Sequence, residues 1–207
     1  MDQVIKIALQ LLELISYLAI IAASGVAVWG INAWRREHVG KRRIELAEQS
    51  LAIVYEIQET LRRIRSIGVR VGEGSTRPRK EDESDEERAA LDEGYALYER
   101  FEPYRELFGK LRAVRYRFKA TFRVKAAEPF DELLEVESKM FRAASKLAFW
   151  ARDYRSPGGQ HSQQALEDLQ RCRLILWGYG GEGDEIFNDV VRIVQRVEDF
   201  CGPMLKI

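Results

Sequence analysis

Residues 14–34 read LISYLAIIAASGVAVWGINAW, 21 consecutive positions without a charged side chain. A helix of this length is about 31 Å long at ~1.5 Å per residue, and the hydrocarbon core of a bilayer is about 30 Å thick. Tyr17 lies near one end of the stretch, and Trp29 and Trp34 lie near the other. Tyrosine and tryptophan side chains are enriched at both ends of transmembrane helices, at the depth of the lipid headgroups. The stretch predicts a transmembrane helix over 14–34, preceded by a short tail over 1–13.

Two other structures produce apolar stretches. A buried core helix is disfavoured because this stretch is long and free of charge. A cleaved signal peptide has a basic start and an apolar part of about 7–15 residues. Here the first 13 residues contain Asp2, Lys6 and Glu13, and apolar residues continue past the small residues 22–24. We therefore expect an uncleaved anchor.

The charges on either side of the stretch predict its orientation. One lysine and two acids precede it, whereas residues 35–43 contain five basic side chains and one acid. The basic side of a transmembrane helix normally faces the cytoplasm. We therefore expect an inner-membrane protein with its N-terminus outside and residues 35–207 in the cytoplasm. The basic residues next to the helix are candidate contacts for anionic lipid: Arg35, Arg36, Lys41, Arg42 and Arg43.

Small side chains recur at spacings of three and four within the predicted transmembrane helix. They are Ser16, Ala19, Ala23, Ala27 and Gly30. This spacing places them on one stripe, and small residues allow two membrane helices to approach closely. The stripe predicts self-association, so we expect a homo-oligomer or a membrane-protein partner.

Helical periodicity continues after the basic segment. Apolar residues from Ile44 to Ile64 recur every three or four positions, which predicts a stalk helix over 35–67. Residues 68–83, GVRVGEGSTRPRKEDE, combine glycine, proline and dense charge, which favours a mobile loop with almost nothing to bury. Ser84 and Glu87 then form a capping box that begins a helix.

The rest of the chain predicts a helical bundle over 84–207 that packs with the stalk. Amphipathic helices are expected over 84–103, 104–125, 128–154, 162–177 and 184–201, the last ended by Gly202-Pro203. No strand-like alternation of useful length occurs. The expected fold class is all-α, with one N-terminal transmembrane helix that continues into a cytoplasmic stalk and bundle.

Residues 110–125 contain seven basic side chains and no acid. Long cationic side chains can line the rims of a core helix, which is the preferred interpretation. The helix can also lie on anionic lipid, with Arg112, Lys119 and Arg123 as candidate contacts. Nucleic acid is disfavoured, since the chain has 33 basic and 33 acidic residues. The acidic block 81–93 favours a solvated segment, with loose pairing to the basic helix as the alternative.

No residue pattern points to catalysis, a cofactor or a metal. Residues 178–183 match G-x-G-x-x-G, but they lack the flanking strands of a dinucleotide site, so a helix–helix connection is expected. The two histidines lie in unrelated segments, and the two cysteines lack metal-site spacing. Glu137 falls on an apolar stripe, where we expect an ion pair with an arginine such as Arg117. Enzymatic activity stays open, without a motif in its favour.

Four short strings resemble segments of a group of bacterial single-pass inner-membrane proteins. They are Trp34–Glu37 (WRRE), Gly40–Glu48 (GKRRIELAE), Gly72–Arg77 (GEGSTR) and Tyr116–Ala120 (YRFKA). The resemblance covers most of residues 30–150 and implies a bacterial inner membrane and a helical cytoplasmic part. It transfers no catalytic or binding residue.

These patterns together predict a membrane-anchored cytoplasmic scaffold or regulatory interaction module. Its expected partners are the lipid bilayer and a second copy or another membrane protein. The alternative is a sensor that responds to anionic lipid or a ligand through the basic helix 104–125. The zero net charge of the chain is a cancellation of opposite blocks: basic at 35–45 and 110–125, and acidic at 81–93.

Overall fold

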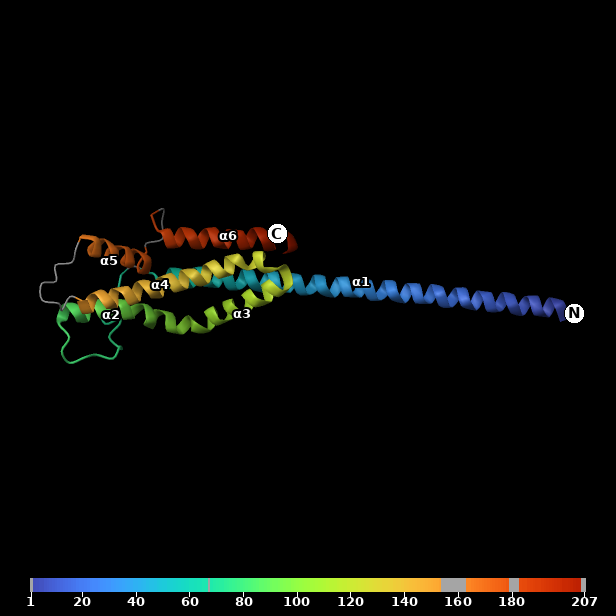
Figure 1. Cartoon of the computed structure of the whole chain (residues 1–207), viewed down its shortest axis with the longest axis horizontal. Helices are drawn as coiled ribbons and strands as arrows, with labels where there is room; N and C mark the ends of the chain where they lie inside the picture. Colours follow the sequence, from blue (N-terminus) through green and yellow to red (C-terminus); the bar gives the residue numbers. More distant parts are fainter. Residues whose placement is uncertain (1, 67, 154–162, 179–182, 206–207) are drawn as a thin grey trace. The chain divides into compact units, whose positions relative to one another are not determined.

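The computed structural model describes residues 2–66, 68–153, 163–178 and 183–205 (Figure 1). No strand occurs in these residues, and the predicted all-α fold is confirmed. The elements are α1 (Asp2–Ile64), α2 (Asp85–Phe101), α3 (Arg105–Phe122), α4 (Glu128–Asp153), α5 (Gln163–Leu176) and α6 (Glu185–Leu205), with the 3₁₀ turns η1 (Glu102–Tyr104) and η2 (Val124–Ala127).

The chain divides into two compact units, residues 1–45 and 46–207. The first unit is the N-terminal part of α1, so most of the predicted tail over 1–13 is helical. Within the described residues, this is the one helix long and apolar enough to cross a membrane by length and composition. Its side chains from Glu13 to Trp34 are exposed, apart from the partly exposed Ala33.

The second unit is a helical bundle with one continuous apolar core. Helix α4 contacts α2, α3, α5 and α6, and the residues of α1 after position 45 contribute their apolar stripe to the same core. Ile44, which we expected to begin that stripe, is 44% exposed and lies before the unit boundary. The largest fully buried side chains come from all six helices and include Ile57, Leu97, Phe108, Phe130, Leu176 and Ile193.

Most helix boundaries follow the local signals. The predicted cap of α2 by Ser84 is confirmed, since the Glu87 amide donates to Ser84 Oγ at 3.1 Å. The expectation that Gly202-Pro203 ends the last helix is wrong, because α6 continues through Pro203 to Leu205. A proline in a final turn removes only one backbone donor. The added turn places Met204 and Leu205 against the core.

Helices α3 and α4 form an antiparallel hairpin with a short connection (Figure 1). Helix α3 ends at Phe122, three residues before the predicted boundary, and Arg123 has a positive φ of 80°. The turn η2 and Glu128-Pro129 then start α4, with proline at a tolerated first-turn position. The short connection determines which residues of the two helices face each other.

Candidate functional site

The predicted association stripe lies on the exposed part of α1. Ser16, Ala19, Ala23, Ala27 and Gly30 are all exposed. The Ser16 hydroxyl donates to the Glu13 carbonyl at 2.7 Å, so its polar atom is satisfied within its own helix. A Cβ added at Gly30 meets no atom within 4 Å.

The five basic residues that follow the apolar stretch form the basic collar: Arg35, Arg36, Lys41, Arg42 and Arg43. All five are exposed. In the described part of the chain, Arg35, Arg36, Lys41 and Arg42 take part in no ion pair. Beside them, the rings of Trp34 and His38 stack with centroids 5.4 Å apart. Arg35, Arg36, Lys41 and Arg42 of the collar are therefore cations open to solvent.

The basic residues of α3 are arranged differently, because acids of α4 pair with them. Arg112 binds both carboxylate oxygens of Glu137 at 2.7 and 2.8 Å. Arg115 and Lys119 both pair with Asp131, at 3.0 and 2.9 Å. Two of the three candidate lipid contacts in this region, Arg112 and Lys119, are thus paired with acids of α4. The third, Arg123, is exposed at the positive-φ turn.

The expectation that Glu137 pairs with an arginine is confirmed, but Arg117 as its partner is wrong. Arg117 donates to the Gln49 amide oxygen at 2.6 Å. In an antiparallel hairpin, residues equally far from the turn lie opposite each other. Glu137 and Arg112 are nearly equidistant from the turn at 123–127, whereas Arg117 is too close to it. The hairpin register was a sequence signal that could have identified Arg112.

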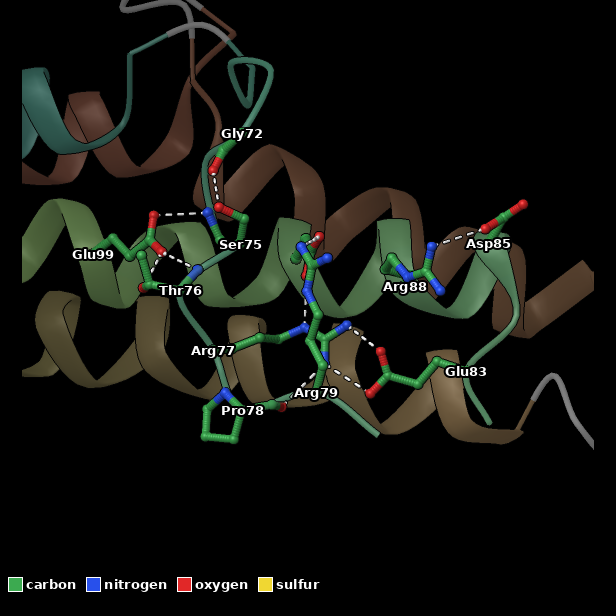
Figure 2. Close-up of polar contacts among 12 residues, drawn as sticks. Gly72, Ser75, Thr76, Arg77, Pro78, Arg79, Glu83, Asp85, Arg88 and Glu99 are labelled. Atoms are coloured by element: carbon green, nitrogen blue, oxygen red, sulfur yellow. Dashed lines mark hydrogen bonds and ion pairs between the residues drawn. The ribbon is translucent and has the colours of Figure 1, made fainter. Parts of the chain in front are cut away.

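The loop 68–83 is attached to α2 by charged side chains (Figure 2). Arg77 binds both carboxylate oxygens of Glu83 at 2.8 and 2.6 Å, and its Nε donates to Asp92 at 2.6 Å. Arg77 and Glu83 are buried, so the expectation that this segment has almost nothing to bury is wrong. Loose pairing of the acidic block with the basic helix is also wrong at these positions. Glu83 and Asp92 pair with Arg77, and Glu93 pairs with Arg173.

A second attachment of this loop uses Glu99 of α2 (Figure 2). Its carboxylate accepts hydrogen bonds from the Gly74 and Thr76 amides at 2.7 and 3.1 Å, and also from the Thr76 hydroxyl. Gly74 has a φ of 79°, and a Cβ there would lie 1.9 Å from the Asp92 carbonyl oxygen. Glycine is therefore required where the loop crosses α2.

Two arginines, the buried Arg65 and the partly buried Arg100, join the end of α1 to other elements. Arg65 binds both carboxylate oxygens of Asp184 at 3.0 and 2.8 Å and donates to the last carbonyls of α5, at residues 174 and 175. Arg100 donates to the carbonyls of residues 64, 66 and 68, pairs with Glu73, and lies 4.8 Å from the Trp177 ring centroid. Arg65 thus satisfies the last carbonyls of α5, and Arg100 satisfies the carbonyl of Ile64 at the end of α1.

The same contacts explain one end of the glycine-rich string 178–183. A Cβ at Gly178 would lie 1.9 Å from Asp184 Oδ2 and 2.3 Å from Arg65 Nη2. Asp184 also accepts from the Phe187 amide at 3.1 Å at the start of α6. Because Gly178 has no side chain, the Arg65–Asp184 ion pair can lie directly against the backbone that follows α5. Residues 179–182 of the string lie outside the described residues.

Two open grooves run beside α2. One, of about 680 Å³, lies between residues 77–83, α2 and α4, and its lining includes Leu91, Tyr95, Tyr98 and Phe149. The other, of about 550 Å³, shares Tyr95 and Tyr98 with it and includes the Arg112–Glu137 pair. The charged groups in their walls are largely bound to each other. The described residues contain no cluster of three or more potential metal ligands.

The two cysteines are buried in the core. Burial raises the pKa of the Cys201 thiol to about 11 and also raises the pKa of the Cys172 thiol. The thiolate is the reactive form and the form that binds metals. Both thiols are thus protonated at neutral pH, as structural cysteines are.

Acidification is expected to release the loop 68–83 through Glu83. The Arg77 hydrogen bond and the Lys80 amide lower the pKa of Glu83 from 4.5 to about 2. Its contribution to stability is therefore complete above about pH 4.5 and is lost as the pH falls to about 2. Hydrogen exchange of residues 74–83 should accelerate over this interval in wild type relative to Glu83→Gln, which lacks the titrating group. Asp85→Asn, which alters an exposed pair with Arg88, should behave as wild type. Identical profiles for wild type and Glu83→Gln would contradict the assignment.

Comparisons of the chain with protein-family models, curated proteins and solved structures find no match.

Proposed function

We propose that this chain is a single-span bacterial inner-membrane protein whose cytoplasmic bundle is a scaffold or regulatory interaction module. One observation carries the proposal: the exposed, uncharged stretch 14–34 is followed directly by the exposed basic collar. An apolar helix surface without protein cover favours lipid as its surroundings. The charge difference across the stretch favours an external N-terminus and a cytoplasmic bundle. The resemblance of residues 34–48 to bacterial single-pass proteins agrees with this setting.

Exposed apolar side chains on the bundle support the interaction role. Leu166 and Leu174 on α5 are 55% and 59% exposed, and they lie two turns apart on the helix. Phe149 on α4 and Val191 on α6 are also exposed. Side chains of this kind suit contact with another helix. We propose that the bundle presents them to a protein partner.

The alternative, a lipid sensor based on residues 104–125, has weaker support. A lipid-binding helix needs several cations directed to the membrane surface. Arg112, Arg115 and Lys119 are instead paired with Glu137 and Asp131 of α4. Withdrawing them for lipid would leave Glu137, whose side chain is 8% exposed, as a buried charge without its partner.

The proposal requires the predicted topology and self-association. A reporter that is active only in the periplasm should be inactive when fused after residue 207, and a cytoplasmic fluorescent reporter should fold there.

For self-association, Gly30→Leu should weaken the dimer of the full chain in mild detergent by tenfold or more, because bulk on the stripe separates the helices. The dissociation constant is measured by sedimentation equilibrium.

Gly25→Leu is the matched control for the stripe. Gly25 is on the opposite side of α1, and a Cβ added there meets no atom within 4 Å, as at Gly30. This variant should dimerise as wild type does. An active periplasmic reporter would contradict the topology, and a strictly monomeric wild type would contradict the self-association.

A further inference from the structure

We infer that the basic collar binds the phosphate groups of anionic phospholipids, and that helix α3 does not. The inference rests on the proposed membrane anchoring and names the lipid class that the anchor selects. It assigns the membrane-binding cations to Arg35, Arg36, Lys41 and Arg42, and excludes the longer basic run over 110–125.

The first part of the argument is the position of the collar on α1. It begins immediately after Trp34, where the uncharged stretch ends, so a spanning helix places it at headgroup depth. Trp34 is exposed and stacks on His38, as expected of an amphipathic ring at that depth. Continuity with the apolar stretch therefore brings the cations to lipid phosphates rather than to a soluble partner.

The second part is helical geometry. Arg35 and Arg42 are seven residues apart, which is two turns, so they share one face of α1 and are separated by about 10.5 Å along its axis. Arg36 lies about 100° from Arg35 around the helix, and Lys41 extends the cationic face on the other side. The collar can therefore contact phosphates on more than one side of the helix. Glu37 is the one acid between these positions.

The third part is the contrast in pairing between the two basic segments. In the described part of the chain, the four cations named above take part in no ion pair. In α3, Arg105, Lys110, Arg112, Arg115 and Lys119 each pair with a carboxylate. A paired cation must give up its partner to bind a phosphate, whereas an unpaired one gives up only water. The basic run over 110–125 is the longer of the two in the sequence, but the ion pairs favour the collar.

The effect expected of lipid binding is large enough to measure. Each basic residue close to an anionic surface strengthens association about fivefold. The attraction weakens with salt, because the Debye length falls from about 10 Å at 0.1 M to about 3 Å at 1 M. Together the four cations should favour anionic over zwitterionic lipid at low salt, and the preference should disappear at high salt.

The test uses the full chain reconstituted in vesicles of phosphatidylcholine and phosphatidylglycerol of equal composition in both leaflets, so that orientation does not affect the result. Spin-labelled forms of the two lipids report their relative association with the protein. The collar variant combines Arg35→Gln, Arg36→Gln, Lys41→Gln and Arg42→Gln. The charge-matched control combines Arg105→Gln, Lys110→Gln, Arg117→Gln and Lys125→Gln in the exposed part of the α3 region. Flotation with phosphatidylcholine vesicles and the far-UV circular dichroism spectrum check insertion and folding.

Wild type and the α3 control should associate with phosphatidylglycerol about fivefold more strongly than with phosphatidylcholine at low salt, and the collar variant should show a ratio near one. A wild-type ratio near one in protein that floats with the vesicles would overturn this inference alone. A preference that survives in the collar variant and is lost in the α3 control would overturn it in favour of α3. Failure of wild type to float with either vesicle would instead overturn the proposed membrane anchoring.

Discussion

Replacing Arg65 with methionine is expected to lower the free energy of unfolding of the bundle by about 3–5 kcal/mol. The side chains of Arg65 and Asp184 are only 6% and 7% exposed. Methionine leaves the Asp184 carboxylate without its bidentate partner, and it leaves the last carbonyls of α5 without donors. Urea unfolding of the detergent-solubilised chain, followed by circular dichroism, measures the loss.

Two variants distinguish a buried pair from a general effect of arginine. Arg63, two residues earlier, pairs with Glu59 on the surface of α1, so Arg63→Met should leave stability unchanged within error. Combining Arg65→Met with Asp184→Leu removes both charges and should cost less than Arg65→Met alone. Equal losses for Arg63→Met and Arg65→Met would show that the buried pair adds nothing to stability.

Phe118→Ala is the second substitution with a large expected effect, a loss of about 3–5 kcal/mol in the free energy of unfolding. The ring is 1% exposed and contacts aromatic rings from three helices. Its centroid lies 4.6 Å from that of Phe122, 4.9 Å from that of Phe130 and 5.3 Å from that of Phe200. Truncation opens a cavity where α3, α4 and α6 meet, and rings on three separate helices cannot easily close it.

Tyr116 is the matched control on the same helix. Its side chain is 62% exposed and lies beside Arg115, whose Cζ is 4.4 Å from the ring centroid. Tyr116→Ala should cost less than about 1 kcal/mol, the range of an exposed cation–π contact. Urea unfolding under identical conditions compares the two variants. A Phe118→Ala loss as small as that of Tyr116→Ala would contradict the packing described for α3.

Local patterns predicted the helices well. Burial at Ala47, Leu51, Val54, Leu61 and Ile64 matches the periodicity of the stalk, and Ser84 caps α2 as its spacing to Glu87 indicates. These features depend on residues a few positions apart, whose relation in a helix is set by its 3.6-residue turn. The error at the end of α6 arose because Met204 and Leu205 gain burial by continuing the helix past Pro203.

The partners of the charged residues could not be found in the same way. Arg65 meets Asp184 and Arg100 meets the end of α1 because distant helices pack together, and neither pairing leaves a periodic trace in the sequence. The Arg77–Glu83 pair is close in sequence, but its burial depends on the surface of α2. The Arg112–Glu137 and Lys119–Asp131 pairs had a usable signal, the register of a hairpin with a short connection.

The sequence by itself determined that the chain is helical, where most helices begin and end, and that residues 14–34 are the one long uncharged apolar stretch. Each of these follows from side chains that are neighbours along one helix. Only the tertiary structure decided which cations are available to a partner. A cation pairs with a carboxylate that lies within about 4 Å of it, and for residues on different helices the packing of those helices creates that proximity. Packing of α4 on α3 thereby pairs Arg112, Arg115 and Lys119 with carboxylates, whereas the collar residues Arg35, Arg36, Lys41 and Arg42 take part in no ion pair in the described residues.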